Sequence, residues 1–190
     1  MARQSVVLVR HGQTAWSLDG RHTGRTDIPL TEEGRRQAAA LGPLLRQQEF
    51  ALVLTSPLQR AEETCRLAGF GEEAQVRPDL AEWDYGTYDG LTSEQIKEGR
   101  PDWSLWRDGG PNGEQAADVG RRVDRVIAEA RSVEGDVLLF AHGHVLRVLA
   151  ARWLGQPPEA GRFYALGTAA RSRLGYEHAD PVIERWNEAS

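Results

Sequence analysis

Short apolar runs and longer stretches of periodic apolar residues alternate along the chain. Two of the runs, residues 6–9 and 137–141, are rich in valine, leucine and phenylalanine, and each is followed within one or two residues by a histidine and a glycine. Continuous apolar runs of this length predict strands that are buried on both faces, as in parallel sheets. Residues 51–55 predict a third buried strand, and the C-terminal part predicts two more near residues 172–176 and 182–186.

The segments between these runs have helical periodicity. Residues 31–48 predict a helix that Thr31 caps, with a kink or a short break at Gly42-Pro43. After the strand at 51–55, Ser56 is expected to cap a further helix of about ten residues, with Pro57 at its first position. Residues 114–132 predict a long amphipathic helix, and residues 145–153 predict another.

The stretch from about residue 70 to residue 113 lacks clear periodicity. It is dense in Gly, Pro and Asp and contains three tryptophans, which need a surface to pack on. We therefore expect loops and short helices, with residues 80–113 forming a lid-like excursion over the active site. The alternation of strands and helices elsewhere predicts an α/β fold, a three-layer α/β/α sandwich, as a single domain over residues 1–190.

Composition narrows the classes of partner. The chain has 190 residues, a formal net charge of −5 and one cysteine, Cys65. A negative net charge does not favour binding to nucleic acid or to an anionic membrane surface. The single cysteine excludes an internal disulfide, and the sequence lacks both an apolar stretch of membrane-spanning length and a recognisable signal peptide. We therefore expect a cytoplasmic protein, without a nucleic-acid or membrane partner.

Two of the predicted strands end in a His-Gly pair, His11-Gly12 and His142-Gly143. A single histidine at a strand end is more often a structural hydrogen-bonding residue than a catalytic one. The carboxyl ends of parallel strands, however, meet at the edge of the sheet where ligands bind. Two imidazoles there, beside Arg10 and Arg60, predict a site for a multiply charged oxyanion such as phosphate.

The same residues suggest a reaction. A neutral imidazole on His11 can attack phosphorus if cations neutralise the phosphate oxygens and an acid protonates the leaving alkoxide. Glu82, beside Trp83 and near Tyr85, is the candidate acid, because apolar surroundings favour a protonated carboxyl. Asp84 is the alternative acid, and an exposed loop carboxylate is the structural alternative for Glu82.

A metal site is the competing interpretation of these histidines. His142 and His144, together with His11 or His22, could ligate zinc, but two side chains at a strand-to-helix turn need not converge. The sequence contains no His-Glu-x-x-His or Cys-x-x-Cys motif, no Walker lysine loop and no dinucleotide-binding glycine pattern. The expectation is therefore that the protein uses no metal and no organic cofactor.

Taken together, the motifs resemble the histidine phosphatase superfamily, in its phosphoglycerate-mutase-like branch. The matching segments run in order along the chain: Leu8-Val9-Arg10-His11-Gly12-Gln13-Thr14, Gly20-Arg21-His22-Thr23-Gly24, Leu30-Thr31-x-x-Gly34, Ser56-Pro57-x-x-Arg60-Ala61-x-x-Thr64, Glu82-x-x-Tyr85-Gly86 and Ala141-His142-Gly143.

The resemblance implies a metal-free enzyme with a mixed, mostly parallel sheet. It implies that His11 is the phosphorylated nucleophile, that Glu82 is the proton donor, and that Arg10, Arg60 and His142 hold the phosphate. The side facing the substrate is expected to include Ser17, Thr23, Gly24, Tyr85, Gly143 and His144.

Departures from the mutase pattern favour hydrolysis of small phosphorylated metabolites. This chain has Ser17 where the mutases have asparagine, Ser93 where they have lysine, and Asp108 where they have the second of two arginines. Replacing the lysine by a hydroxyl and one arginine by a carboxylate weakens binding of the second charged group of a phosphoglycerate. A cofactor-dependent phosphoglycerate mutase is the enzymatic alternative. A non-catalytic phosphate-binding or regulatory protein is the alternative of another class, which needs neither His11 nor Glu82.

Overall fold

The computed structural model describes residues 4–189, and its centre is a six-stranded sheet in the order β3-β2-β4-β1-β5-β6. The first four strands of the chain run parallel, and the last two are antiparallel to their neighbours. The prediction of a mixed, mostly parallel sheet is therefore confirmed. The strands are β1 (Val6–Arg10), β2 (Leu52–Thr55), β3 (Ala74–Val76), β4 (Val137–Ala141), β5 (Arg171–Glu177) and β6 (Asp180–Glu188).

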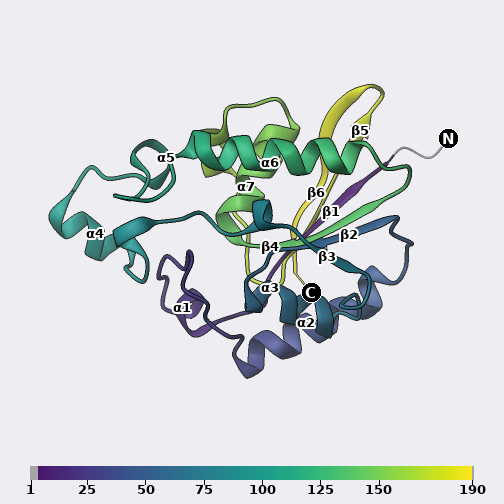
Figure 1. The fold of residues 1–190 in the computed structure, drawn as a ribbon, viewed down its shortest axis with the longest axis horizontal. Coiled ribbons are helices and arrows are strands. Elements are labelled where there is room, and N and C mark those ends of the chain that lie inside the picture. The colour runs from purple at the N-terminus through teal and green to yellow at the C-terminus, as the bar shows by residue number, and fades with distance from the viewer. Residues whose placement is uncertain (1–3, 190) are drawn as a thin grey trace.

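Helices cover both faces of this sheet (Figure 1). On one face, α2 (Glu32–Leu45) and α3 (Gln59–Leu67) pack with Val7 and Val9 of β1. On the other face, α6 (Ala116–Arg131) and α7 (Gly143–Trp153) pack with Val6 and Leu8. Alternate residues of one strand thus enter two separate cores, which explains why the strand is apolar throughout. The three-layer α/β/α prediction is confirmed.

Helix α2 differs from its prediction at its C-terminal end. Thr31 caps it as expected, because its hydroxyl accepts a hydrogen bond from the Gly34 amide at 3.0 Å. Of the kink or short break expected at Gly42-Pro43, the break is absent, since the helix runs through Pro43 to Leu45. Leu41 and Leu45 are buried in the core on this face, and this packing holds the helix together across the one hydrogen bond that proline removes.

The start of α3 was predicted wrongly. Its N-cap is Leu58, without a side-chain cap, so neither Ser56 nor Pro57 lies inside the helix. The Ser56 hydroxyl instead lies 2.6 Å from Nε2 of His142 and accepts a hydrogen bond from the Leu58 amide. The Ser56 hydroxyl, which the sequence pattern assigns to a helix cap, thus bonds His142 instead.

Short elements fill the stretch between β2 and α6, as expected, and β3 among them was not predicted. Trp83 and Trp103 are buried there, and their indole N–H groups donate to the carbonyls of Glu114 and Gly109. The other short elements of this stretch are η1 (Pro78–Leu80), η2 (Gly86–Tyr88), α4 (Ser93–Gly99) and α5 (Leu105–Asp108). Two further elements outside it were also not predicted, α1 (Ala15–Leu18) and η3 (Pro158–Phe163).

Within residues 4–189, no helix has both the length and the apolar composition needed to cross a lipid bilayer.

Candidate active site

The two His-Gly pairs meet at the carboxyl edge of the sheet. Arg10 of β1 is in register with Ala141 of β4, so the next residues, His11 and His142, emerge side by side with ring centroids 5.1 Å apart. The parallel pairing of two strands far apart in the sequence is therefore what builds this pair.

His11 presents one unprotonated nitrogen. Its Nδ1 lies 2.7 Å from the carbonyl oxygen of Gly12, to which it donates, and this leaves the lone pair on Nε2. Burial, followed by the positive charges of Arg10 and Arg60, holds the pKa of His11 well below its usual value. A neutral imidazole with a free Nε2 is the form that can act as a nucleophile at neutral pH.

Arg60 lies behind His11, fully buried. Its Nε donates to Nδ1 of His142 at 3.1 Å, and its terminal nitrogens donate to the carbonyls of Thr23, Gly24 and Thr26 at 3.0–3.1 Å. Burial lowers the pKa of Arg60 from a very high ordinary value, so the group is still a cation. It therefore places positive charge under the site and ties the 23–26 loop to α3.

Both ring nitrogens of His142 are engaged by protein groups. Nδ1 accepts from Arg60, so Nε2 carries the proton and donates to Ser56 Oγ at 2.6 Å. Burial and the nearby Arg60 hold the pKa of His142 well below its usual value, so its ring is neutral. The structure places His142 and Arg60 behind the pocket wall, and their direct contact with phosphate stays a prediction.

Arg10 and the N-terminus of α7 form the cationic wall of the pocket. Arg10 Nη1 donates to the carbonyl of Leu166 at 2.5 Å. A Cβ at Gly143, the first residue of α7, would lie 3.4 Å from the Arg10 guanidinium, in ordinary van der Waals contact, so this arginine lies directly beside the helix N-terminus. Helix N-termini attract anions through their free N–H groups and dipole.

Glu82 faces the same wall and is held by three backbone N–H groups. Oε1 accepts from Trp83 and Val145, and Oε2 accepts from His144, at 2.8–3.0 Å. The expected apolar surroundings are only part of its environment, although Glu82 is buried. Asp84 is turned elsewhere, because Oδ1 accepts from the Gly86 amide and Oδ2 lies 3.6 Å from Arg25.

Arg10, His11, Glu82 and Gly143 line a cavity of about 180 Å³. Most of the predicted site residues contribute to its lining, whereas Arg60, His142 and Gly24 lie behind it. Arg147 was not predicted, although its position four residues after Gly143 places it on the same helix face. The lining consists of Arg10, His11, Ser17, Gly20, Arg21, His22, Thr23, Glu82, Tyr85, Gly143, His144, Arg147 and Leu166.

Tyr85 and His144 form a neutral hydrogen-bonded pair in this wall. Burial raises the pKa of Tyr85 well above its usual value and holds that of His144 well below its own. The Tyr85 hydroxyl therefore donates to Nδ1 of His144, 2.6 Å away. His22 stacks on His144 at 5.9 Å between ring centroids, and its Nε2 lies 3.1 Å from Ser93 Oγ.

The histidines are not arranged as metal ligands. In the part of the chain that the structure describes, no group of three or more His, Cys, Asp or Glu side chains is placed to hold a metal ion. His142 contacts Arg60 and Ser56, whereas His144 contacts Tyr85.

Known proteins match the chain along nearly its whole length. The model of the histidine phosphatase superfamily (branch 1) matches residues 6–189. An acid phosphatase of Mycobacterium tuberculosis is 44% identical over 177 residues, covering 91% of this chain and 87% of the relative. Sedoheptulose 1,7-bisphosphatase of Saccharomyces cerevisiae is 38% identical, covering 78% of this chain and 67% of the relative. Phosphoglycerate mutases are among the relatives as well.

The fold has close solved counterparts. The structure of an open reading frame product of Mycobacterium tuberculosis has a TM-score of 0.94 and 41% sequence identity, covering 99% of both chains.

The low pKa of His22 predicts a specific loss of stability in acid. Burial lowers this pKa from 6.5 to about 4, so between these pH values the unfolded chain binds a proton that the folded chain does not. The free energy of unfolding should therefore fall as the pH decreases through this range, by up to about 3 kcal/mol from His22. Denaturant unfolding at a series of pH values measures it. The His22→Gln variant should lose less stability over the same range; an equal loss would contradict the argument.

Proposed function

The chain belongs to the histidine phosphatase superfamily (branch 1), and from this membership we propose how its residues carry out the reaction. The protein is a phosphatase that acts on small phosphorylated metabolites. We propose that it does so through a phosphohistidine formed on His11. The observation that carries this proposal is the tautomer of His11, which leaves Nε2 free in a pocket walled by Arg10.

The reaction takes two displacements. The Nε2 lone pair of His11 attacks phosphorus while the bond to the ester oxygen breaks, and Glu82 protonates the departing oxygen. Water then attacks the phosphohistidine, Glu82 accepts a proton from that water, and His11 leaves as a neutral imidazole with inorganic phosphate as product. Arg10 and the α7 N-terminus neutralise charge on the phosphoryl oxygens in both steps.

The position of Glu82 supports its role as the acid. Its three backbone hydrogen bonds fix the carboxyl in the pocket wall, between Tyr85 and the α7 N-terminus. The carboxyl thus lies in the pocket that His11 and Arg10 also line, where it can pass a proton to the leaving oxygen of a bound ester.

Two contacts support hydrolysis over isomerisation. Arg107 is paired with Asp108, whose pKa is lowered to about 2 mainly by that arginine, so the guanidinium is already occupied. Ser93 bonds His22, and the lysine of α4 lies one turn further on, at Lys97. A mutase needs a second set of cationic side chains to bind the other charged group of its substrate. In this chain two positions of that set, Ser93 and Asp108, supply no cation.

The remaining functional predictions are also proposed, each on an observation of its own. Metal-independent catalysis without a cofactor is supported by the engagement of His142 and His144 with protein groups. A cytoplasmic location is supported by the free, buried thiol of Cys65. We also propose that the protein is one domain in which residues 80–113 act as a lid, because Tyr85 lines the pocket and Trp103 packs against His22.

Replacement of His11 tests the phosphohistidine directly. Brief incubation with a ³²P-labelled ester, followed by denaturation in alkali, should trap label that is stable in alkali and labile in acid. His11→Ala should abolish both the label and the turnover of a generic aryl phosphate. Most of the activity surviving in His11→Ala would overturn the proposal, and loss of wild-type activity on chelation would favour the metal alternative.

Glu82→Gln should lower kcat for alkyl phosphates by about 10² to 10⁴-fold, the usual size of a general-acid contribution. Aryl phosphates should lose less, because a good leaving group needs less protonation. Steady-state kinetics on the two ester types measures the difference, with Asp84→Asn as the matched control. Equal losses on both ester types would assign Glu82 to binding or orientation instead.

Incubation with 3-phosphoglycerate should release inorganic phosphate faster than it yields 2-phosphoglycerate. The physical reason is the weaker binding of the second charged group, which lets water reach the phosphohistidine before the sugar acid is phosphorylated again. Parallel assays of both products, with and without added bisphosphoglycerate, measure the ratio. Faster isomerisation than phosphate release would make the mutase reading correct.

A further inference from the structure

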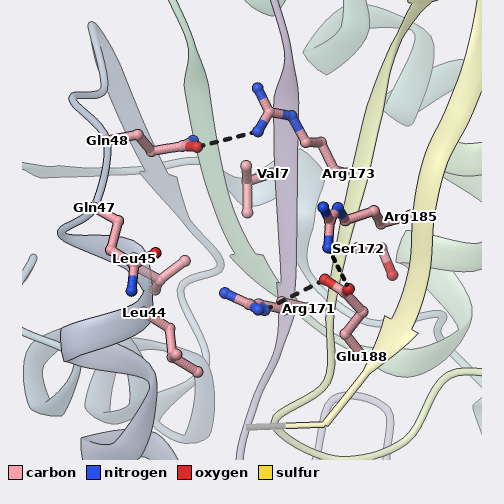
Figure 2. Close-up of a pocket in the computed structure, with 10 residues that line it drawn as sticks. All are labelled: Val7, Leu44, Leu45, Gln47, Gln48, Arg171, Ser172, Arg173, Arg185 and Glu188. Atoms are coloured by element: carbon pink, nitrogen blue, oxygen red, sulfur yellow. Dashed lines mark hydrogen bonds and ion pairs between the residues drawn. The ribbon is translucent and has the colours of Figure 1, made fainter.

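A second cavity lies on the α2 face of the sheet, formed by other residues than those of the catalytic pocket. It has a volume of about 210 Å³ and lies between the end of α2 and the β5–β6 hairpin (Figure 2). That volume is several times the ~30 Å³ that a water molecule occupies in the liquid. Its lining consists of Val7, Leu44, Leu45, Gln47, Gln48, Arg171, Ser172, Arg173, Arg185 and Glu188.

Sheet register gathers the three arginines in this cavity. In the antiparallel pair of β1 and β5, Val9 lies opposite Arg171 and Val7 lies opposite Arg173, so both arginines share the face of the valines. Arg185 joins them from β6, opposite Arg173. Three guanidinium groups thus face one glutamate, Glu188, in the lining, while Glu184 and Asp136 contact Arg173 from outside it.

The arginines are incompletely partnered. Within residues 4–189, five buried side-chain polar atoms lack a hydrogen-bond partner, and three of them belong to this lining: Nε2 of Gln48 and Nε of both Arg171 and Arg173. A fourth is Nε of Arg10, in the catalytic pocket. The same signature, a buried guanidinium N–H without a hydrogen bond, marks both cavities. Buried unpaired donors are costly and point to an absent acceptor.

The nearby carboxylates do not supply the missing hydrogen-bond acceptors. Glu188 is shared, with Arg185 Nη1 donating to Oε1 at 3.0 Å and Arg171 Nε 3.5 Å from Oε2. Glu184 lies 2.9 Å from Arg173 Nε, but out of line for a hydrogen bond, and Asp136 lies 3.8 Å from its Nη2. The side chains of Arg171 and Arg173 are still 27% and 36% exposed, so their forks can turn toward an incoming ligand.

We propose that this cavity is a second anion site, which takes a small dianionic oxyanion of the phosphate type. Arginine forks match the oxygens of such an anion, and three of them converge on this cavity. Glu188 acts as the resident anion that the ligand displaces. The apolar residues Val7, Leu44 and Leu45 at the wall leave room for the organic part of an ester.

The site is tested by ¹H–¹⁵N NMR titration with inorganic phosphate, with chloride adjusted to keep the ionic strength constant. The amides of Gln47, Gln48 and Arg173 should shift with a saturable dependence, separately from those of Gly143 and His144 at the catalytic pocket. Phenylphosphonate, titrated in the same way, distinguishes an organic ester from free phosphate. Tighter binding of phenylphosphonate assigns the site to esters, and equal or weaker binding assigns it to phosphate itself.

Two opposite substitutions sharpen the test. Replacing Arg171 and Arg185 together by glutamine should raise the Kd at the cavity by about tenfold or more, since charge-assisted hydrogen bonds are lost. Glu188→Gln should lower it by about two- to fivefold, because the competing carboxylate is removed. Arg185→Gln alone changes a largely exposed side chain and covers the case in which the double variant does not fold. Arg36→Gln, an exposed arginine of α2, is the control and should change nothing.

Three outcomes would overturn the proposal. One is a linear, unsaturable shift of the cavity amides; another is an equal Kd in the wild type and the arginine variants. The third is loss of the cavity shifts in Arg10→Gln, which would mean that those amides only report phosphate in the catalytic pocket. None of these outcomes bears on the catalytic proposal, because turnover in the cavity variants measures that separately.

Discussion

The catalytic end of the sheet depends on one buried guanidinium, that of Arg60. A charge removed from water is tolerated only when hydrogen bonds replace its hydration, and here three carbonyls of residues 23–26 and the ring of His142 do so. These hydrogen bonds fix the conformation of the 23–26 loop and the tautomer of His142. They also hold a positive charge beneath His11. His142 and His11 stay neutral beside it, so Arg60 is the source of positive charge beneath these two rings.

The strands and the residues at their ends were the predictable part of the molecule. A strand buried on both faces needs an unbroken apolar run, so β1, β2 and β4 were recognised within one residue of their bounds. Parallel strands then place His11 and His142 at one edge of the sheet, whatever lies between them in the chain. Glu82 could be chosen from its aromatic neighbours, but its orientation comes from backbone donors of α7 that no local pattern reveals.

What the sequence did not reveal depends on packing between distant segments. Strand β3 has three residues at the sheet edge, two of them exposed, so it has no apolar run to recognise. Ser56 has the appearance of a helix cap until His142, 86 residues away, is brought against it. The contact of Arg60 with phosphate stays a prediction, whereas its hydrogen bonds to the carbonyls of the 23–26 loop depend on where α3 lies, which no local pattern reveals. In each case a polar group had several possible partners, and tertiary structure selected one.

The position of β1 in the sheet also sets the order of events during synthesis. Val6 pairs with Val137 on one side and with Leu174 on the other, so β1 receives both neighbours only once the segments around residues 137 and 174 have been made. Such distant pairings carry a large loop-closure entropy and slow the folding of a domain. Until then β1 is an apolar strand with two open edges, and such a strand in a nascent chain is prone to aggregate.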